Sequence, residues 1–190
     1  MLVIKGQDHN TLQGLATTHE GEVVFRGVNN QLVLGDQVKL EQVKIHFLGA
    51  QGRLEIADRC VIRGEIIIQA GARVSIGAGT KMNKPCHIRV AAHNHVQIGA
   101  GCLLANVKIH AFESVSLINT ATEQRINPIT PIEVGDRVWI AENCQLGCGA
   151  AIGQGTVIGA NSVVNTPIAA DSLAVGYPAR VVKSDIRWAE

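Results

Sequence analysis

The chain has 190 residues, of which 46% are hydrophobic but only 3% aromatic, and its formal net charge is +1. Lys and Arg are scattered, so no basic face indicates binding to nucleic acid or to an anionic membrane. No stretch approaches the length of a membrane span, and we expect a cytoplasmic protein whose ligands are small molecules or protein.

In the N-terminal half, a short motif recurs in which an aliphatic residue is followed by Gly or Ala. It starts at Leu34, Ile56, Ile76 and Ile98, so the starts lie about 20–22 residues apart. Turn residues cluster at 28–31 and 50–53. This spacing predicts irregular coils with slightly enlarged corners over residues 1–105.

The rhythm stops over residues 119–133, a polar stretch with two prolines. We predict a loop ejected from the repeat, and a loop of this kind on a rigid scaffold is usually functional. A tolerated surface insertion is the alternative, because the closure entropy of a loop grows only slowly with its length.

Residues 134–163 contain five tandem hexapeptides. Their aliphatic residues are Val134, Ile140, Leu146, Ile152 and Ile158, and each is followed by Gly or Ala. A period of six fits neither an α-helix nor a lone strand, so the chain must repeat one short supersecondary unit. Three units of strand and corner make a triangular coil of about eighteen residues. We therefore predict an all-β fold, a parallel β-helix shaped as a triangular prism.

Three of the five cysteines occupy an inward position of this repeat. Cys60, Cys102 and Cys144 fall at the fifth place of their hexapeptides, where a small side chain is expected, so we predict buried thiols and no disulfides. Cys86 and Cys148 lie outside that place and are assigned no chemistry. Residues 169–190 leave the repeat and are predicted to cap the last coil of a single domain spanning 1–190.

Four features together resemble the left-handed β-helix acyltransferases, most closely the saccharide and serine O-acetyltransferase branch. They are the hexapeptides, the Val-Trp-Ile triplet at 138–140, the Arg-Ile-Asn-Pro segment at 125–128 and the Gly-Tyr-Pro-Ala segment at 176–179. The resemblance runs from about residue 27 to residue 188. It implies a left-handed helix, a homotrimer of parallel prisms, acetyl-CoA in the groove between neighbours and a saccharide acceptor beside the ejected loop.

The resemblance also implies direct acetyl transfer. A histidine removes the proton of the acceptor hydroxyl, the oxygen attacks the thioester, and backbone amides stabilise the oxyanion. Many relatives carry Ile-Arg-Thr-Ser-Asp-x-His-Ser-Ile where this chain has Ile-His-Ala-Phe-Glu-Ser-Val-Ser-Leu at 109–117. Val115 therefore occupies the histidine position and cannot accept a proton, while His110 and Glu113 occupy the Arg and Asp positions.

Two interpretations of these residues remain open. In the first, His110 is a relocated base that Glu113 orients, because alternation from an inward Ile109 places His110 outward. The chain is then an acetyl-CoA-dependent O-acetyltransferase acting on a saccharide hydroxyl, in surface-polysaccharide biosynthesis. In the second, His110 is an exposed rung of stacked coils, and the chain is a non-catalytic trimeric scaffold or regulatory protein.

Cofactor binding is assigned to four residues, Trp139, Tyr177, Arg180 and Lys183. By charge and by resemblance, Arg180, Lys183 and Arg187 suit the phosphates of CoA, although three basic residues on a tail are equally explained by solvation. Tyr177 replaces the Asn that is usual in the tail of relatives. Trp139 suits the groove or a subunit contact, and packing is the safer interpretation.

We assign no metal. His93 and His95 would face one side of a strand and could share a metal or line an interface, but two ligands are too few alone. The γ-class carbonic anhydrases have the same fold, yet Glu142 and Gly147 stand where their zinc-binding histidines should be. Hydration chemistry through such a zinc site is therefore not expected here.

Overall fold

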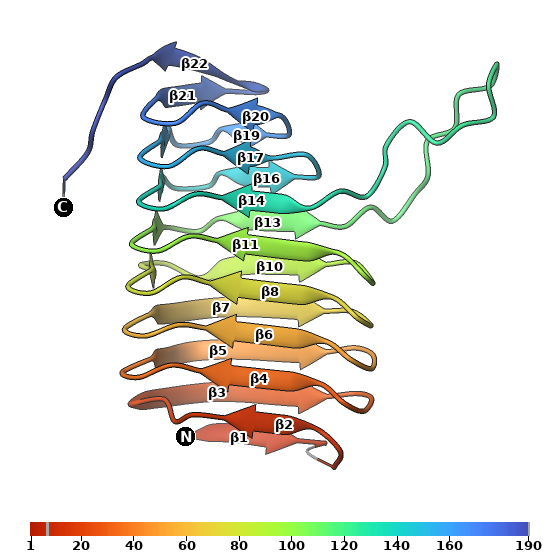
Figure 1. Ribbon diagram of the computed structural model, residues 1–190, viewed down its shortest axis with the longest axis vertical. Helices are drawn as coiled ribbons and strands as arrows, with labels where there is room; N and C mark the ends of the chain where they lie inside the picture. The colour runs from red at the N-terminus through yellow and green to blue at the C-terminus, as the bar shows by residue number, and fades with distance from the viewer. Residues whose placement is uncertain (7, 190) are drawn as a thin grey trace.

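The computed structural model describes residues 1–6 and 8–189, and every regular element in these ranges is a β-strand. The strands wind as a left-handed coil around one apolar core (Figure 1). This arrangement confirms the predicted all-β parallel helix. No helix in the described ranges is long and apolar enough to cross a membrane.

The strands fall into two groups, which are separated by a long loop at residues 112–131, here called the arm. Before the arm come β1 (Leu2–Lys5), β2 (Thr11–Gln13), β3 (Thr18–Phe25), β4 (Gln31–Leu34), β5 (Lys39–Phe47), β6 (Arg53–Ile56), β7 (Val61–Ile68), β8 (Arg73–Ile76), β9 (Lys81–Met82), β10 (Cys86–Val90), β11 (His95–Ile98), β12 (Leu103–Leu104) and β13 (Lys108–Ala111). After it come β14 (Ile132–Val134), β15 (Trp139–Ile140), β16 (Gln145–Gly147), β17 (Ala151–Ile152), β18 (Val157–Ile158), β19 (Val163–Val164), β20 (Pro167–Ile168), β21 (Leu173–Gly176) and β22 (Ala179–Lys183).

The prism has three faces. An 8-stranded sheet, β2-β4-β6-β8-β11-β14-β17-β20, forms the first face. The Trp139 face holds β9, β12, β15, β18 and β21, and the His110 face holds β10, β13, β16 and β19. These two faces belong to one 14-stranded sheet because the long strands β3, β5 and β7 continue from one face to the next.

Glycine makes the bend within the long strands possible. Gly64 in β7 has a φ of 107°, and a Cβ there would lie 2.0 Å from the carbonyl oxygen of Cys86 in the next coil. A side chain is therefore excluded on steric grounds and by the backbone conformation. Gly21 in β3 meets the same constraint, with a φ of 140° and the oxygen of Val43 at 1.9 Å.

The inward residues stack in register along the axis. On the first face, Leu34 pairs with Ile56, Ile56 with Ile76, Ile76 with Ile98, and Ile98 with Val134. The first four residues of this column are the motif starts found in the N-terminal half of the sequence, and all five are buried. Full burial of each such side chain contributes about 1.5–3 kcal/mol, so the column is a major source of stability.

The enlarged N-terminal corners are confirmed. Leu34 and its partner Ile56 are 22 positions apart, whereas Val134 and its partner Ile152 are 18 apart. The additional residues include the turn at 50–52, where Gln51 has a φ of 60°. A longer corner adds exposed turn residues while leaving the inward column in register.

The cysteines at the inward position are buried as predicted, and all five cysteines are free. Each of the three inward thiols lies near a carbonyl oxygen of the next coil, as with Cys60 Sγ, 3.1 Å from Gly77 O. Burial raises the pKa of each of these thiols. Cys86, at the start of β10, is also buried, and burial raises its pKa to about 11.

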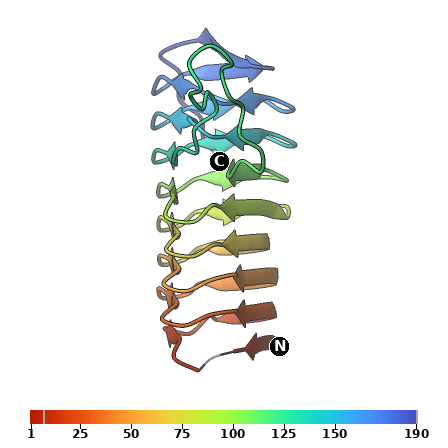
Figure 2. The same cartoon turned by 90° about the vertical axis from the view of Figure 1, so that its right-hand side faces the viewer.

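The arm is longer at its start than the sequence indicated. β13 ends at Ala111 and β14 begins at Ile132, so residues 112–118 belong to the arm, and residues 132 and 133 are strand. This start was not predicted because residues 112–118 keep several apolar side chains, as a strand of the repeat would. Figures 1 and 2 show the arm projecting from the prism toward its C-terminal coils.

The cap is shorter than the predicted 169–190. β21 still pairs in parallel with β18, and Ala174 takes the inward place above Ile158, so the coil continues to Gly176. Only β22 turns back, antiparallel to β21, and it covers the exposed edge. Residues 184–189 then leave the cap on the side opposite the arm (Figure 1), and residue 190 lies outside the described residues.

Candidate functional site

The two ends of the arm are held together by one buried side chain. Asn94 Nδ2 donates to Ala111 O at 3.3 Å and to Thr130 O at 3.1 Å, while its Oδ1 accepts from the amide of His95 at 2.8 Å. Ala111 is the last residue before the arm and Thr130 is near its end. The side chain of Asn94 therefore fixes where the arm leaves the prism and where it returns.

His110 lies on β13, directly before this junction. Its neighbour Ile109 is fully buried, and alternation along the strand places the imidazole outside on the His110 face. Partial desolvation of the ring lowers the pKa of His110, and the nearby charges of Lys108, Arg89 and His87 lower it further. The imidazole is thus largely neutral at pH 7, which is the state that a general base requires.

The structure does not bring Glu113 to His110. Glu113 is exposed at the start of the arm, and the described residues contain no hydrogen bond or ion pair between the two side chains. The charged groups that act on His110 are cationic instead. An orienting role for Glu113 therefore stays a prediction that requires the start of the arm to move.

Val115, which the family resemblance predicts to occupy the histidine position, lies on the arm and is 65% exposed. Its carbonyl oxygen accepts from Asn127 Nδ2 at 2.9 Å, and the amide of Leu117 donates to Asn127 Oδ1 at 2.7 Å. Asn127 belongs to the Arg-Ile-Asn-Pro segment. That segment therefore has a structural function, which is to hold the two sides of the arm together.

The four predicted cofactor residues lie on the Trp139 face and its cap. Trp139, in β15, is 42% exposed and sits two rungs below β21 in the same ladder. Tyr177 is 83% exposed in the turn between β21 and β22, and Arg180 and Lys183 are exposed on β22. No contact between Trp139 and the other three is present among the residues that the structure describes.

Trp139 instead meets the end of the chain. The ring centroids of Trp139 and Trp188 lie 6.3 Å apart, and Trp188 Nε1 donates to Arg137 O at 2.7 Å. Arg137, Arg187 and Trp188 line a hollow of about 420 Å³. The carboxylates of Asp136 and Asp171 line the same hollow. Tryptophan rings beside guanidinium groups suit a nucleotide with phosphates, so the rings and the two guanidinium groups could contact the nucleotide end of a CoA thioester. Trp188 lies outside the repeat, so no periodic signal in the sequence could have found it.

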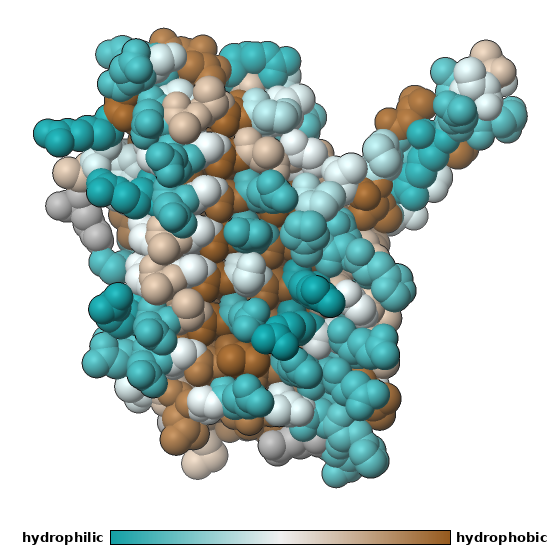
Figure 3. All heavy atoms as spheres, viewed as in Figure 1, coloured by the Kyte–Doolittle hydropathy of each residue, from teal (hydrophilic) through white to brown (hydrophobic). Residues whose placement is uncertain are grey.

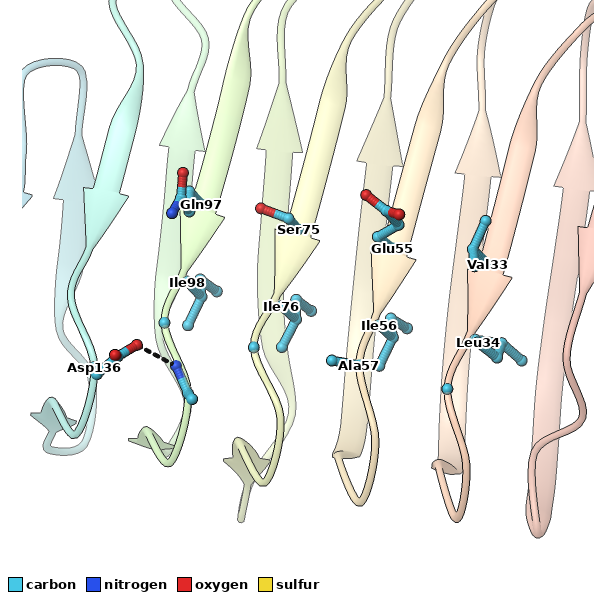
Figure 4. A pocket seen from close by; sticks show the side chains of 14 residues that line it. Val33, Leu34, Glu55, Ile56, Ala57, Ser75, Ile76, Gln97, Ile98 and Asp136 are labelled. Carbon is cyan, nitrogen blue, oxygen red and sulfur yellow. Dashed lines mark hydrogen bonds between the residues drawn. The ribbon is translucent and has the colours of Figure 1, made fainter.

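A second hollow, of about 440 Å³, follows the first-face strands along several coils. Figure 3 shows an apolar stripe down this side, and Figure 4 shows one row of Ile56, Ile76 and Ile98 beside an outer row that includes Glu55. Its two carboxylates are engaged: Asp136 Oδ1 accepts from the Ala100 amide at 2.7 Å, and Glu55 pairs with Arg53 at 2.6 Å. The hollow therefore offers an apolar wall and no free catalytic group.

The possible metal pair fails for a backbone reason. His93 has a φ of 57° and sits in a turn, so it does not alternate with His95, which begins β11. His95 Nε2 lies 3.7 Å from Glu133 Oε1 on the neighbouring strand. Within residues 1–6 and 8–189, no three His, Cys, Asp or Glu side chains are grouped closely enough to hold a metal ion.

Comparisons with known proteins agree with this fold. The family model "Bacterial transferase hexapeptide (six repeats)" matches residues 131–166. The chain is 27% identical over 147 residues to the putative lipopolysaccharide biosynthesis O-acetyl transferase WbbJ of Escherichia coli. The aligned region covers 65% of this chain and 75% of that protein. It is 30% identical over 129 residues to the polysialic acid O-acetyltransferase of Escherichia coli. That alignment covers 67% of this chain but only 42% of that protein.

Solved structures extend the likeness over the whole chain. The crystal structure of the polySia-specific acetyltransferase NeuO gives a TM-score of 0.85 at 27% identity and covers 100% of this chain and 84% of that one. The polysialic acid O-acetyltransferase OatWY gives a TM-score of 0.85 at 23% identity, with 100% and 88% covered, and supports the fold alone. With its hexapeptide repeats, ejected arm and O-acetyltransferase relatives, this chain belongs to the left-handed β-helix transferases of the hexapeptide-repeat family.

Proposed function

We propose that the protein transfers the acetyl group of acetyl-CoA to a hydroxyl of a saccharide, in the cytoplasm and in surface-polysaccharide biosynthesis. The observation that carries the proposal is His110, an outward imidazole of lowered pKa beside the junction of the arm. The names of the relatives WbbJ and NeuO support the reaction class and the polysaccharide context.

In the proposed reaction, His110 accepts the proton of the acceptor hydroxyl as the oxygen attacks the acetyl carbonyl of the thioester. The carbon–sulfur bond breaks, and the sulfur leaves as the thiol of CoA after it takes up a proton. His110, now protonated, can supply that proton. Arg137, Arg187 and the two tryptophans would hold the nucleotide end of the donor.

We also propose that the working form is a homotrimer. His110 and Trp139 occupy different faces of one prism, so a single subunit does not bring base and donor site together. Packing of three prisms would place the His110 face of one beside the Trp139 face of the next. The arm supports this proposal because it projects from the prism and exposes four large apolar side chains, Val115, Leu117, Ile118 and Ile126.

The trimer predicts a mass in solution of about 61 kDa, which is three times 20.2 kDa. We expect Leu117→Asp with Ile126→Asp to shift the protein toward the monomer mass, since charges on buried apolar contacts oppose association. Thr122→Asp, at an exposed site on the same arm, is the matched control. Multi-angle light scattering measures all three proteins, and a wild-type monomer would rule out the trimer.

A second function remains supported by Val115, which stands where relatives have histidine. A protein that kept the prism and lost the base would be a non-catalytic scaffold or regulatory partner. Calorimetry with acetyl-CoA, combined with release of free CoA over a panel of saccharides, separates the two functions. We expect micromolar binding and acceptor-dependent CoA release; absence of both would favour the scaffold.

A further inference from the structure

The His110 face carries a second set of charged groups around the proposed base. A hollow of about 270 Å³ there is lined by side chains of β7, β10 and β13, among them Glu65, His87, Arg89, Lys108 and His110. In the ladder, His87 lies opposite Lys108 and Arg89 lies opposite His110. Adjacent rungs are about 4.8 Å apart, so the four basic side chains form a compact two-by-two grid.

The grid has an excess of positive charge. Arg89 and Lys108 supply two permanent cations and Glu65 one anion, which leaves +1 before the two imidazoles are counted. Glu65 Oε2 lies 3.7 Å from His87 Nδ1, so the carboxylate faces the imidazole. Lys44 of β5 lies opposite Glu65 of β7 in the strand register, so it adds a further positive charge next to the grid.

Neither permanent cation of the grid is neutralised by the protein. The backbone amide of Lys108 donates to Cys144 O at 3.0 Å, but within the described residues its ammonium group has no hydrogen bond or ion pair, and Arg89 has no carboxylate partner there. The Arg89 guanidinium instead lies 3.9 Å from the ring centroid of Phe112, at the start of the arm. Its buried Nε has no hydrogen-bond partner. That buried atom is closed to a ligand, but an anionic group placed over the grid would give Lys108 and the Arg89 guanidinium the negative partner that the described residues do not supply.

We propose that this grid binds a carboxylate of the acceptor, so that the acceptor is an acidic saccharide. This rests on the proposed function, because it gives the chemical class of the substrate at the same site. The carboxylate contacts Lys108 and Arg89 through charge-assisted hydrogen bonds. Because Arg89 and His110 are neighbouring rungs, a sugar held by its carboxylate presents a nearby hydroxyl to the imidazole of His110.

The test compares acidic and neutral forms of the same polymers. Polysialic acid and polygalacturonate, and the carboxyl-reduced form of each, are titrated into wild-type protein, Lys108→Gln and Arg73→Gln by calorimetry. Arg73 is exposed and begins β8 on the first face, away from both faces that the trimer would bring together, so it is the control for loss of one positive charge. We expect binding of an acidic polymer that weakens at least about tenfold in Lys108→Gln and weakens with added salt, and no change in Arg73→Gln.

Several results would overturn the proposal. Binding of neither acidic polymer, or equal binding of an acidic polymer and its reduced form, would contradict it. A rise in KM for acetyl-CoA alone in Lys108→Gln would assign the grid to the phosphates of the donor instead. The binding readout does not depend on turnover, so acidic polymer bound without acetylation would leave this site standing and reject the transferase. Acetylation of neutral saccharides at an equal rate by Lys108→Gln and the wild type would support the transferase and reject the acidic-saccharide site.

Discussion

His110→Ala is expected to lower kcat for acetyl transfer by about 10²–10⁴-fold, which is the usual contribution of a positioned general base. The imidazole is the one group of the His110 face that combines an outward position beside the arm with a lowered pKa. Steady-state release of CoA with a saturating acceptor measures the effect. Acetyl-CoA affinity should be unchanged, because the donor residues lie on the other face.

The pH dependence carries an independent signature. A general base works in its unprotonated form, so kcat/KM should rise with pH through the pKa of His110 in the free protein. Desolvation and the cations Lys108 and Arg89 lower that pKa below the 6.5 of an unperturbed histidine. The acidic limb should therefore have its midpoint below 6.5, and Lys108→Gln should shift the midpoint upward by removing one of these charges.

His95→Ala is the matched control for this experiment, because His95 lies on the first face and contacts Glu133 rather than the grid. It should keep wild-type kcat. If His110→Ala also kept wild-type kcat, His110 would be only an exposed rung of the ladder. Val115→His then becomes decisive: a large gain in turnover would support the prediction that the base expected at this position of the arm has been lost in this chain.

Phe47→Ala is expected to destabilise the N-terminal coils by about 3–5 kcal/mol, the usual cost of truncating a buried aromatic residue to alanine. Phe47 is fully buried at the end of β5 and stacks on Phe25 of the preceding coil, with centroids 4.8 Å apart and ring planes at 19°. Each coil contacts only its neighbours. The loss should therefore concentrate in β3, β5 and β7, which hydrogen exchange can resolve by strand.

Leu48→Ala provides the comparison from the next position along the chain. Leu48 is 42% exposed, so its truncation should change the free energy of unfolding by no more than about 0.5 kcal/mol. Urea denaturation of the two variants and the wild type measures the difference. Equal destabilisation by Phe47→Ala and Leu48→Ala would mean that the aromatic stack does not hold these coils together.

Much of the fold could be predicted from the sequence because a stacked coil has few variables. Once Val134 and Ile152 set the period, the inward columns, the small buried cysteines and the parallel pairing follow from one repeating unit. The bend at Gly64 was not predicted, because a glycine inside a strand has many explanations until its neighbour Cys86 is placed against it. The start of the arm was also missed, since the sequence of 112–118 keeps apolar residues at intervals that imitate a strand.

The candidate site was predicted less completely, for reasons of distance along the chain. Strand alternation placed His110 outward correctly. Neither the cations around it nor the stacking of Phe112 on Arg89 could be inferred, because these contacts join different coils. The same holds for Trp188, which reaches Trp139 across 49 positions. The pairing of His110 with Glu113 was suggested by their closeness in sequence. Because the chain leaves the prism at residue 112, closeness in sequence does not bring these two side chains together.

Asn94 has a consequence for how this chain can change over time. One carboxamide bridges the carbonyl groups on either side of the arm, so the coils above and below meet as though no residues intervened. The segment between Ala111 and Thr130 can therefore grow, shrink or exchange its sequence without disturbing the inward columns. Substrate choice and subunit contacts can diversify on such an insert while the prism that presents the imidazole stays constant.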